Sequence, residues 1–119
     1  MGYITSTFRR KPFTYIYGYT NSILAFGIFL KETNQIPLKH ICPTLKLVLV
    51  TAELCPENMK IELSEIFGVP VYNEYGSSET NIIAIENKSQ EWEIASEKLF
   101  VEIVDDQGLS VSEGKVGNI

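Results

Sequence analysis

The sequence predicts an α/β fold, in which a parallel β-α-β-α-β unit is followed by a mixed or antiparallel β segment. Three observations support this prediction. Apolar runs of strand length alternate with segments of helical periodicity over residues 14–79. The helical segments are long enough to connect parallel strands by right-handed crossovers. After residue 79, short strand-like segments are separated only by polar turns, a pattern typical of antiparallel or mixed sheets.

The first strand and the first helix follow closely on one another. A short apolar run at residues 15–17 stops at Gly18. We expect Thr20 or Asn21 to cap the following helix, because a side-chain oxygen there accepts a hydrogen bond from an otherwise unpaired first-turn amide. The helix should continue to residue 33 or nearby. Its residues are apolar on almost every side, so it should be largely buried or covered by further parts of a larger protein.

The second strand is the clearest of the chain. Residues 34–45 contain Pro37 and Pro43 and form a connection, with one helical turn expected at residues 38–41. Residues 46–51 then give a continuous run of apolar, largely β-branched side chains. Such a run predicts a strand that is buried on both faces, as in a parallel sheet covered by helices.

A second helix and a third strand complete the predicted parallel unit. Pro56 suits the first turn of a helix, where its missing amide costs nothing. Apolar residues then recur at helical spacing on one face until Gly68, which closes the helix at its C′ position. Residues 69–73 form the third strand.

The chain divides into three parts. Residues 1–13 carry no clear periodicity and are expected to be loosely ordered, residues 14–79 form the α/β unit, and residues 80–119 form a β-rich segment. The strands expected in this last part are residues 82–85, 92–94 and 98–104.

Composition and charge exclude several classes of function. A net charge of −5 argues against nucleic-acid binding, which normally brings a basic surface to neutralise phosphates. Cys42, Cys55 and the single His40 show no metal-ligand spacing, so we expect free thiols in a reducing cytoplasm. No secretory signal is recognisable, and the longest apolar run has eight residues against the roughly 20 that span a bilayer. The sequence thus predicts a cytoplasmic protein with no membrane and no nucleic-acid partner.

One short segment combines groups that suit a nucleotide site. It follows the third strand and consists of Asn73, Glu74, Tyr75, Gly76, Ser77, Ser78 and Glu79. An aromatic ring can stack on a base, and a hydroxyl can donate to a phosphate oxygen. A carboxylate can hold a hard divalent cation that keeps several waters. Taken singly, each of these residues also fits an ordinary core, surface or turn position.

Two further connections are expected to lie beside this segment. Residues 18–22 follow the first strand, and residues 51–54 follow the second. The carboxyl ends of parallel strands share one edge of a sheet, and ligands of α/β folds bind just beyond that edge. The three connections should therefore converge on one site.

The same segments carry a resemblance to a known family. Residues 73–79 resemble the N-x-Y-G-x-[ST]-E signature of the adenylate-forming superfamily, which includes acyl- and aryl-CoA ligases. Residues 18–22, 51–54 and 108–117 resemble flanking segments of these enzymes, and the chain most resembles phenylacetate-CoA ligase-like members. The resemblance covers residues 12–119 and implies that the chain is part of a larger adenylating domain.

The resemblance implies a nucleotide site. Tyr75 would lie against adenine, and Asn73 would lie near the exocyclic amine of the base. The backbone of Ala52 and Glu53 would cover the opposite face of the adenine. The full set of nucleotide-binding residues implied by the resemblance is Ala52, Glu53, Asn73, Glu74, Tyr75, Gly76, Ser77 and Ser78.

Two residues of the signature would act in catalysis. Ser78 matches the hydroxyl that contacts the α-phosphate, and Glu79 matches the acid that binds Mg²⁺. Two neighbouring residues are ambiguous. Tyr19 could border the pocket for the acid or simply pack, and the Glu53 side chain could act in the site or be an exposed acid near a helix start.

The implied function is an ATP-dependent ligase that activates a small carboxylic acid as an acyl-adenylate and then transfers the acyl group to coenzyme A or another thiol. Its cofactors would be ATP or AMP, Mg²⁺ and coenzyme A. The superfamily's phosphate loop is not recognisable in residues 1–72, and its later aspartate and lysine would follow residue 119. We therefore expect an internal fragment that is inactive alone. The apolar helix at residues 23–30 and any uncovered sheet edge also predict self-association, as a homodimer or larger species. Two alternatives stay open: a non-catalytic nucleotide-binding or interaction module, and an α/β scaffold whose signature is coincidental.

Overall fold

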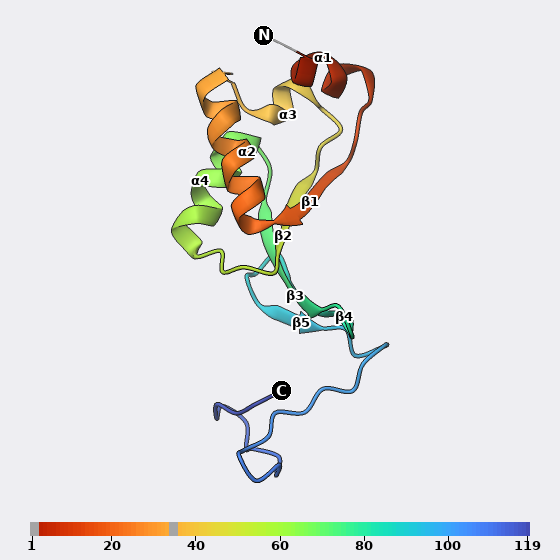
Figure 1. Ribbon diagram of the computed structural model, residues 1–119, viewed down its shortest axis with the longest axis vertical. Coiled ribbons are helices and arrows are strands. Elements are labelled where there is room, and N and C mark those ends of the chain that lie inside the picture. Colours follow the sequence, from red (N-terminus) through yellow and green to blue (C-terminus); the bar gives the residue numbers. More distant parts are fainter. Residues whose placement is uncertain (1–2, 34–35) are drawn as a thin grey trace.

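The computed structural model describes residues 3–33 and 36–119 and shows a mixed α/β fold built on a five-stranded sheet (Figure 1). The strands are β1 (Tyr15–Tyr19), β2 (Leu47–Thr51), β3 (Val71–Ser77), β4 (Asn81–Glu86) and β5 (Trp92–Ile94). The helices are α1 (Tyr3–Arg10), α2 (Thr20–Thr33), α3 (Leu38–Ile41) and α4 (Glu57–Phe67). The strands lie in the order β1-β2-β3-β4-β5, so each strand pairs with its neighbours in the chain.

The sheet has a parallel half and an antiparallel half. β1 pairs with β2, and β2 with β3, in parallel, whereas β3, β4 and β5 are antiparallel to one another. The crossovers between the parallel strands contain α2 and α4. This arrangement confirms the predicted fold class, and the short helix α3 lies where one helical turn was expected.

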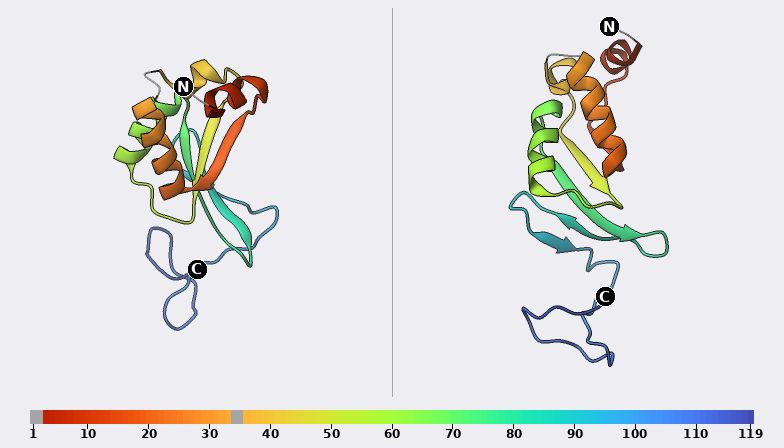
Figure 2. Two further views of the ribbon diagram at one scale, coloured as in Figure 1. Left: turned by 45° about the horizontal axis from the view of Figure 1, so that its top comes forward. Right: turned by 60° about the vertical axis from the view of Figure 1, so that its left-hand side comes forward.

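Helices α2 and α4 lie side by side and cover one face of the parallel strands (Figures 1 and 2). Val48 and Val50 of β2 are fully buried beneath them. A Cβ atom on Gly27 of α2 would lie only 3.0 Å from the Leu63 side chain of α4, so glycine permits this close packing. As predicted, Gly68 ends α4 in the left-handed region, with φ at 72°.

The opposite face of the sheet is open, because within the described residues both crossovers lie on the same side. Tyr15, Tyr17 and Tyr19 of β1 are 61%, 54% and 61% exposed on this face, and Leu49 of β2 is half-buried beside them. The prediction that the second strand is buried on both faces is therefore wrong for this chain. Right-handed crossovers between strands in the order β1-β2-β3 place both helices on one face, whatever the hydrophobicity of the strand.

Helix α2 is buried along one side only. Ile23 and Leu30 belong to the core, whereas Ile28 and Phe29 are 45% and 43% exposed. The expectation of a largely buried helix is thus not met within this chain. Its outer side remains an uncovered apolar surface, which was the other possibility that the sequence allowed.

Helix α1 was not predicted, because the sequence at its position lacks a clear period. Aromatic contacts explain why a helix forms there. The Phe8 ring lies 4.9 Å from the Phe13 ring and 5.9 Å from the Phe26 ring of α2, both in edge-to-face geometry. These tertiary contacts anchor the helix at the amino ends of the strands, away from the predicted site (Figure 1).

The last part of the chain extends away from the sheet (Figure 1). The strand predicted at residues 98–104 is absent from the described structure, which has only isolated bridges from Val104 to Ser110 and Asn118. Phe100 and Val116 are 88% and 98% exposed. The alternating pattern of residues 98–104 is thus present, but no neighbouring strand pairs with it here.

Within the described ranges, no helix is both long and apolar enough to cross a membrane.

Candidate functional site

The first two predicted connections meet through Glu53. The Thr20 hydroxyl donates to the Glu53 carbonyl at 3.0 Å, and the Asn21 amide donates to Glu53 Oε2 at 2.7 Å. The Asn21 side chain donates to Glu53 Oε1 at 2.8 Å. The first-turn amide of α2 is therefore capped by a carboxylate from a distant connection, and not by Thr20 or Asn21 as predicted. Sequence spacing gives no signal for such a long-range cap.

The connection after β2 turns sharply at its first residue. Ala52 has a φ of 66°, which is uncommon for a residue with a Cβ atom. This conformation directs the chain from the end of β2 toward the start of α2, where Glu53 makes its contacts. Strained backbone of this kind is more frequent at functional sites than elsewhere.

The third connection is tied to the second by Asn73. The Asn73 side chain donates to the Cys55 carbonyl at 3.4 Å and to Glu86 Oε2 at 3.2 Å, and its backbone amide donates to the same oxygen at 2.9 Å. Lys60 of α4 donates to Glu86 Oε1 at 2.5 Å. The Asn73 side chain, which the resemblance would place near the adenine amine, is thus already hydrogen-bonded to Cys55 and Glu86.

The charges of this cluster stabilise one another. Burial alone would raise the pKa of Glu86, but the Lys60 ammonium and the Asn73 amides outweigh that effect and lower it. Burial alone would lower the pKa of Lys60, but the Glu57 and Glu86 carboxylates raise it. Both groups are therefore charged at neutral pH, and the backbone at Asn73 is firmly placed.

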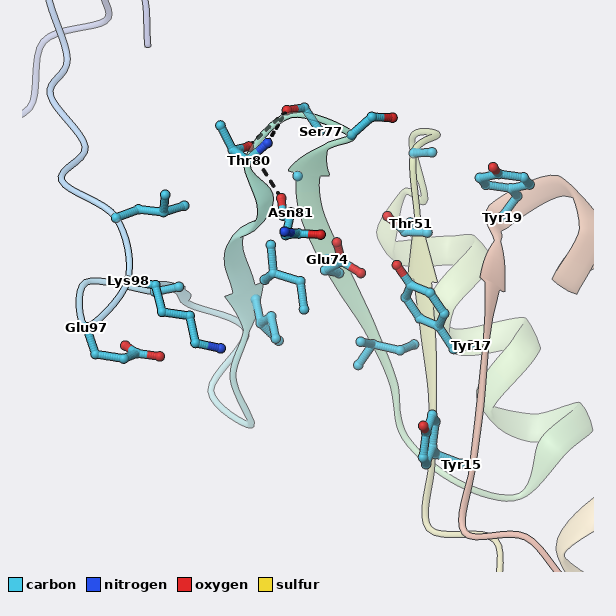
Figure 3. A pocket seen from close by; sticks show the side chains of 18 residues that line it. Tyr15, Tyr17, Tyr19, Thr51, Glu74, Ser77, Thr80, Asn81, Glu97 and Lys98 are labelled. Atoms are coloured by element: carbon cyan, nitrogen blue, oxygen red, sulfur yellow. Dashed lines mark hydrogen bonds between the residues drawn. The ribbon is translucent and has the colours of Figure 1, made fainter.

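A concave pocket of about 1080 Å³ lies on the open face of the sheet, where it extends along β1 from Tyr15 to Tyr19 and reaches the carboxyl ends of β2 and β3. We call it the open-face pocket. Its lining includes Tyr15, Tyr17, Tyr19, Leu49, Thr51, Ala52, Glu74, Gly76, Ser77, Ser78, Thr80, Asn81, Ile82, Ile85, Ala95, Glu97, Lys98 and Leu99. Figure 3 shows the three tyrosines in a row along β1, with Tyr19 at the carboxyl end of the strand, Tyr17 beside Glu74 and Tyr15 at the opposite end.

The structure divides the predicted site residues between the two faces of the sheet. Ala52, Glu74, Gly76, Ser77 and Ser78 line the open-face pocket, as does Tyr19. The four remaining residues, Glu53, Asn73, Tyr75 and Glu79, do not line it. Side chains of a strand alternate between faces, so Asn73 and Tyr75 lie on the face that carries the helices.

Glu74 is the most unusual residue of the open-face pocket. It pairs with Thr51 in the sheet register and is 7% exposed. Its Oε2 atom has no hydrogen-bond partner among the described residues. Hydrogen bonding to the Glu74 side chain, together with burial, raises the pKa of the Tyr17 phenol above its ordinary value of 10.0. The Tyr17 hydroxyl is therefore protonated at neutral pH.

The turn between β3 and β4 carries the last residues of the signature. The Thr80 amide donates to the Ser77 hydroxyl at 3.2 Å, and the Ser77 and Thr80 hydroxyls are 2.9 Å apart (Figure 3). A Cβ atom on Gly76 would lie 2.2 Å from the Asn81 carbonyl oxygen, so only glycine fits there. Ser78 and Glu79 are exposed in this turn.

Sequence reasoning missed Tyr15 and Tyr17 as pocket residues and treated them only as part of a strand. The available signal was the spacing of Tyr15, Tyr17 and Tyr19, which places three rings on one face of a strand. The cysteines lie elsewhere: Cys42 and Cys55 are both buried and free. The described residues contain no group of three or more His, Cys, Asp or Glu side chains that could hold a metal ion.

Solved structures that share this fold include CoA ligases of the adenylate-forming superfamily. The anthranilate CoA ligase AuaEII, solved with anthranoyl-AMP, is 25% identical with a TM-score of 0.68, over 97% of this chain and 22% of that one. A benzoate CoA ligase from Burkholderia xenovorans LB400 is 17% identical with a TM-score of 0.69, over 96% and 23%. A 2-hydroxyisobutyryl-CoA ligase, in an open conformation with 2-HIB-AMP and CoA, is 15% identical with a TM-score of 0.79, over 96% and 26%.

The chain thus spans between 22% and 26% of the length of these enzymes. No family model matches its sequence, and no curated protein gives a significant match.

Proposed function

We propose that this chain is part of an ATP-dependent ligase that activates a carboxylic acid. In the first step, a carboxylate oxygen of the acid attacks the α-phosphorus of ATP, an acyl-adenylate forms, and pyrophosphate leaves. In the second step, the thiol of coenzyme A takes the acyl group and AMP leaves. The observation that supports this most is that three motif-bearing connections meet at one end of the sheet, in a fold shared with CoA ligases.

The signature residues would bind the nucleotide at this end of the sheet. Tyr75 is 48% exposed, which leaves its ring available to stack on adenine. The backbone of Ala52 and Glu53 would cover the other side of the base. Asn73, held by Glu86, would contribute mainly to the shape of the site. Ser78 would donate its hydroxyl to the α-phosphate, where positioning and charge compensation favour the reaction.

Glu79 would hold Mg²⁺ together with the phosphates. Mg²⁺ keeps several waters and binds through one or two carboxylates plus substrate phosphates. A single exposed carboxylate in the turn beside Ser78 fits that requirement. When bound, the ion neutralises phosphate charge.

The finer assignment is to phenylacetate-CoA ligase-like enzymes, which the signature and its flanking segments resemble most closely. We also propose a cytoplasmic location, because Cys42 and Cys55 are free thiols, as is usual where disulfides are reduced. Because the chain spans about a quarter of the matched ligases, we expect no acyl-adenylate formation by the 119-residue chain alone.

The experiment that tests the nucleotide site is a titration of the chain with AMP, followed by two-dimensional amide NMR, which detects millimolar affinities. AMP should shift the amides of residues 52–53 and 73–79. Tyr75→Ala should weaken binding about tenfold, because stacking of a base on an aromatic ring contributes about 1–3 kcal/mol. Tyr15→Ala is the matched control, since Tyr15 is similarly exposed but lies at the far end of β1. Equal effects of the two variants would contradict the proposed adenine site.

A further inference from the structure

A buried carboxylate with one oxygen atom that lacks a hydrogen-bond partner among the described residues faces the open-face pocket. Glu74 is 7% exposed, and its Oε2 atom accepts no hydrogen bond from the described residues. Leaving a buried carboxylate unpaired is costly, so such a group requires an explanation. The ion pairs found in the described part of the chain are Lys31–Glu62, Lys60–Glu57 and Lys60–Glu86, and none of them involves Glu74.

The surroundings of Glu74 suit a positively charged organic group. The three tyrosine rings of β1 line the same pocket, and the faces of aromatic rings attract ammonium cations. Glu74 is the buried carboxylate of the lining, whereas Glu97 and Lys98 of the same lining are exposed. Figure 3 shows the Glu74 carboxylate between β3 and the Tyr17 ring, with Glu97 and Lys98 on the far side of β4.

We propose that Glu74 binds an ammonium group carried by the carboxylic acid that the enzyme activates, so that the open-face pocket selects amine-bearing acids. This inference rests on the proposed function, because it places the reacting carboxylate near Ser78. It also assigns Glu74 to recognition of the acid and not to the nucleotide. The Tyr17 hydroxyl and the Thr51 side chain flank the same position and complete the polar end of the pocket.

The spacing along β3 limits the kind of acid. Ser77, the last residue of β3 and the neighbour of Ser78, follows Glu74 by three residues, which corresponds to about 10 Å of extended strand. The amine of an α-amino acid is adjacent to the acid's own carboxylate, so it would not reach Glu74 while that carboxylate lies near Ser78. The pocket therefore suits an acid whose amine is separated from the carboxylate by an aromatic ring or an alkyl chain.

The test compares two acids of nearly equal size, para-(aminomethyl)benzoate and para-ethylbenzoate, titrated into the chain in the presence of AMP. We expect the cationic acid to bind at least about tenfold more tightly, since a hydrogen bond to a charged group contributes about 1.5–3 kcal/mol. The amides of Thr51 and Glu74 should report the binding. Equal affinities of the unmodified chain for the two acids would overturn the inference without any variant.

Two variants test whether the preference for the amine depends on Glu74 itself or on any negative charge in the pocket. Glu74→Gln keeps the shape of the side chain and should abolish the preference for the amine. Glu97→Gln removes an exposed carboxylate of the same pocket and should retain the preference. A preference that survives in Glu74→Gln, or disappears in Glu97→Gln, contradicts the assignment.

AMP titrated alone distinguishes this inference from the proposed function. If AMP shifts residues 73–79 but the two acids are bound equally, the inference fails and the proposed function stands. If AMP leaves these amides unchanged, the nucleotide site itself fails, and the inference fails with it.

Discussion

The Lys60 ammonium of α4 lies 2.5 Å from the Glu86 carboxylate of β4, and both side chains are buried. This ion pair joins the helical layer to the antiparallel half of the sheet. The second oxygen of Glu86 accepts hydrogen bonds from Asn73, the first residue of the segment that resembles the adenylate-forming signature. The position of the candidate nucleotide site is thus coupled to a buried ion pair outside it.

Glu86→Gln should destabilise the chain by about 3 kcal/mol, because removal of one partner leaves the other buried and incompletely paired. Glu62→Gln is the matched control. It breaks the Lys31–Glu62 pair, which has a similar contact at 3.1 Å but is largely exposed, and should cost at most about 1 kcal/mol. Urea unfolding followed by circular dichroism measures both, and equal losses would show that the buried pair has no special role.

Glu86 should also make the stability of the chain sensitive to acid. Its pKa in the folded chain is below the ordinary value of 4.5, so the unfolded chain binds the proton at higher pH. The stabilisation is complete above the ordinary pKa and is lost as the pH falls through the lowered one. Lys60, with its raised pKa, stabilises below its ordinary value of 10.5 and loses the effect as the pH rises through the folded pKa. Glu86→Gln should therefore flatten the acid side of the stability profile, and an unchanged slope would contradict this account.

Glu53→Gln should weaken the start of α2. The variant loses the charged group that accepts from the Asn21 amide, and loss of a helix cap typically costs about 1 kcal/mol. Glu65→Gln, an exposed change within α4, should be almost neutral by the same urea measurement. AMP affinity should change little in Glu53→Gln, since only backbone atoms of residues 52–53 are proposed to contact the base. A large loss of AMP binding would instead place the carboxylate itself in the site.

Glu79→Gln should remove metal binding without affecting the fold. With Mn²⁺ in place of Mg²⁺ and ATP present, paramagnetic broadening should affect the amides of residues 77–80 in the unmodified chain and disappear in the variant. Unfolding stability should change by less than about 0.5 kcal/mol, because the side chain is exposed in a turn. In a complete ligase the same change should slow adenylation about 100-fold, equivalent to about 2.7 kcal/mol. Broadening that persists in Glu79→Gln would exclude this carboxylate as the ligand.

The chain should self-associate through the outer side of α2. Ile28 and Phe29 are 45% and 43% exposed there, and uncovered apolar surface favours association. Light scattering over a range of concentrations should show dimers or larger species. Phe29→Lys should shift the distribution toward monomer, whereas Lys46→Gln, an exposed change just before β2, should not. A monomer at every concentration would contradict the expectation.

Local patterns in the sequence determined most of the α/β unit. The apolar run at residues 46–51, Pro56 and Gly68 each act through neighbouring residues, so a strand, a helix start and a helix end could be predicted from them. The signature at residues 73–79 likewise pointed to an adenylating fold, which the solved CoA ligases share. The predictions were wrong where the secondary structure depends on distant residues. Helix α1 was not predicted and is stabilised by aromatic contacts. Residues 98–104 have the pattern of a strand, but no strand of the described structure pairs with them.

The candidate site shows the same division. The sequence by itself determined which groups follow the three strands and that the connections should meet, because the direction of parallel strands fixes which ends lie together. Only the tertiary structure decided which face each side chain occupies. In the folded chain Glu74 lines the same pocket as the tyrosines of β1, Asn73 donates hydrogen bonds to Glu86, and Glu53 caps α2. The physical reason is that burial and hydrogen bonding of a side chain depend on residues brought beside it by the fold. The hydrogen bonds from Asn73 to Glu86 and from Asn21 to Glu53 join residues that are 13 and 32 positions apart in the chain.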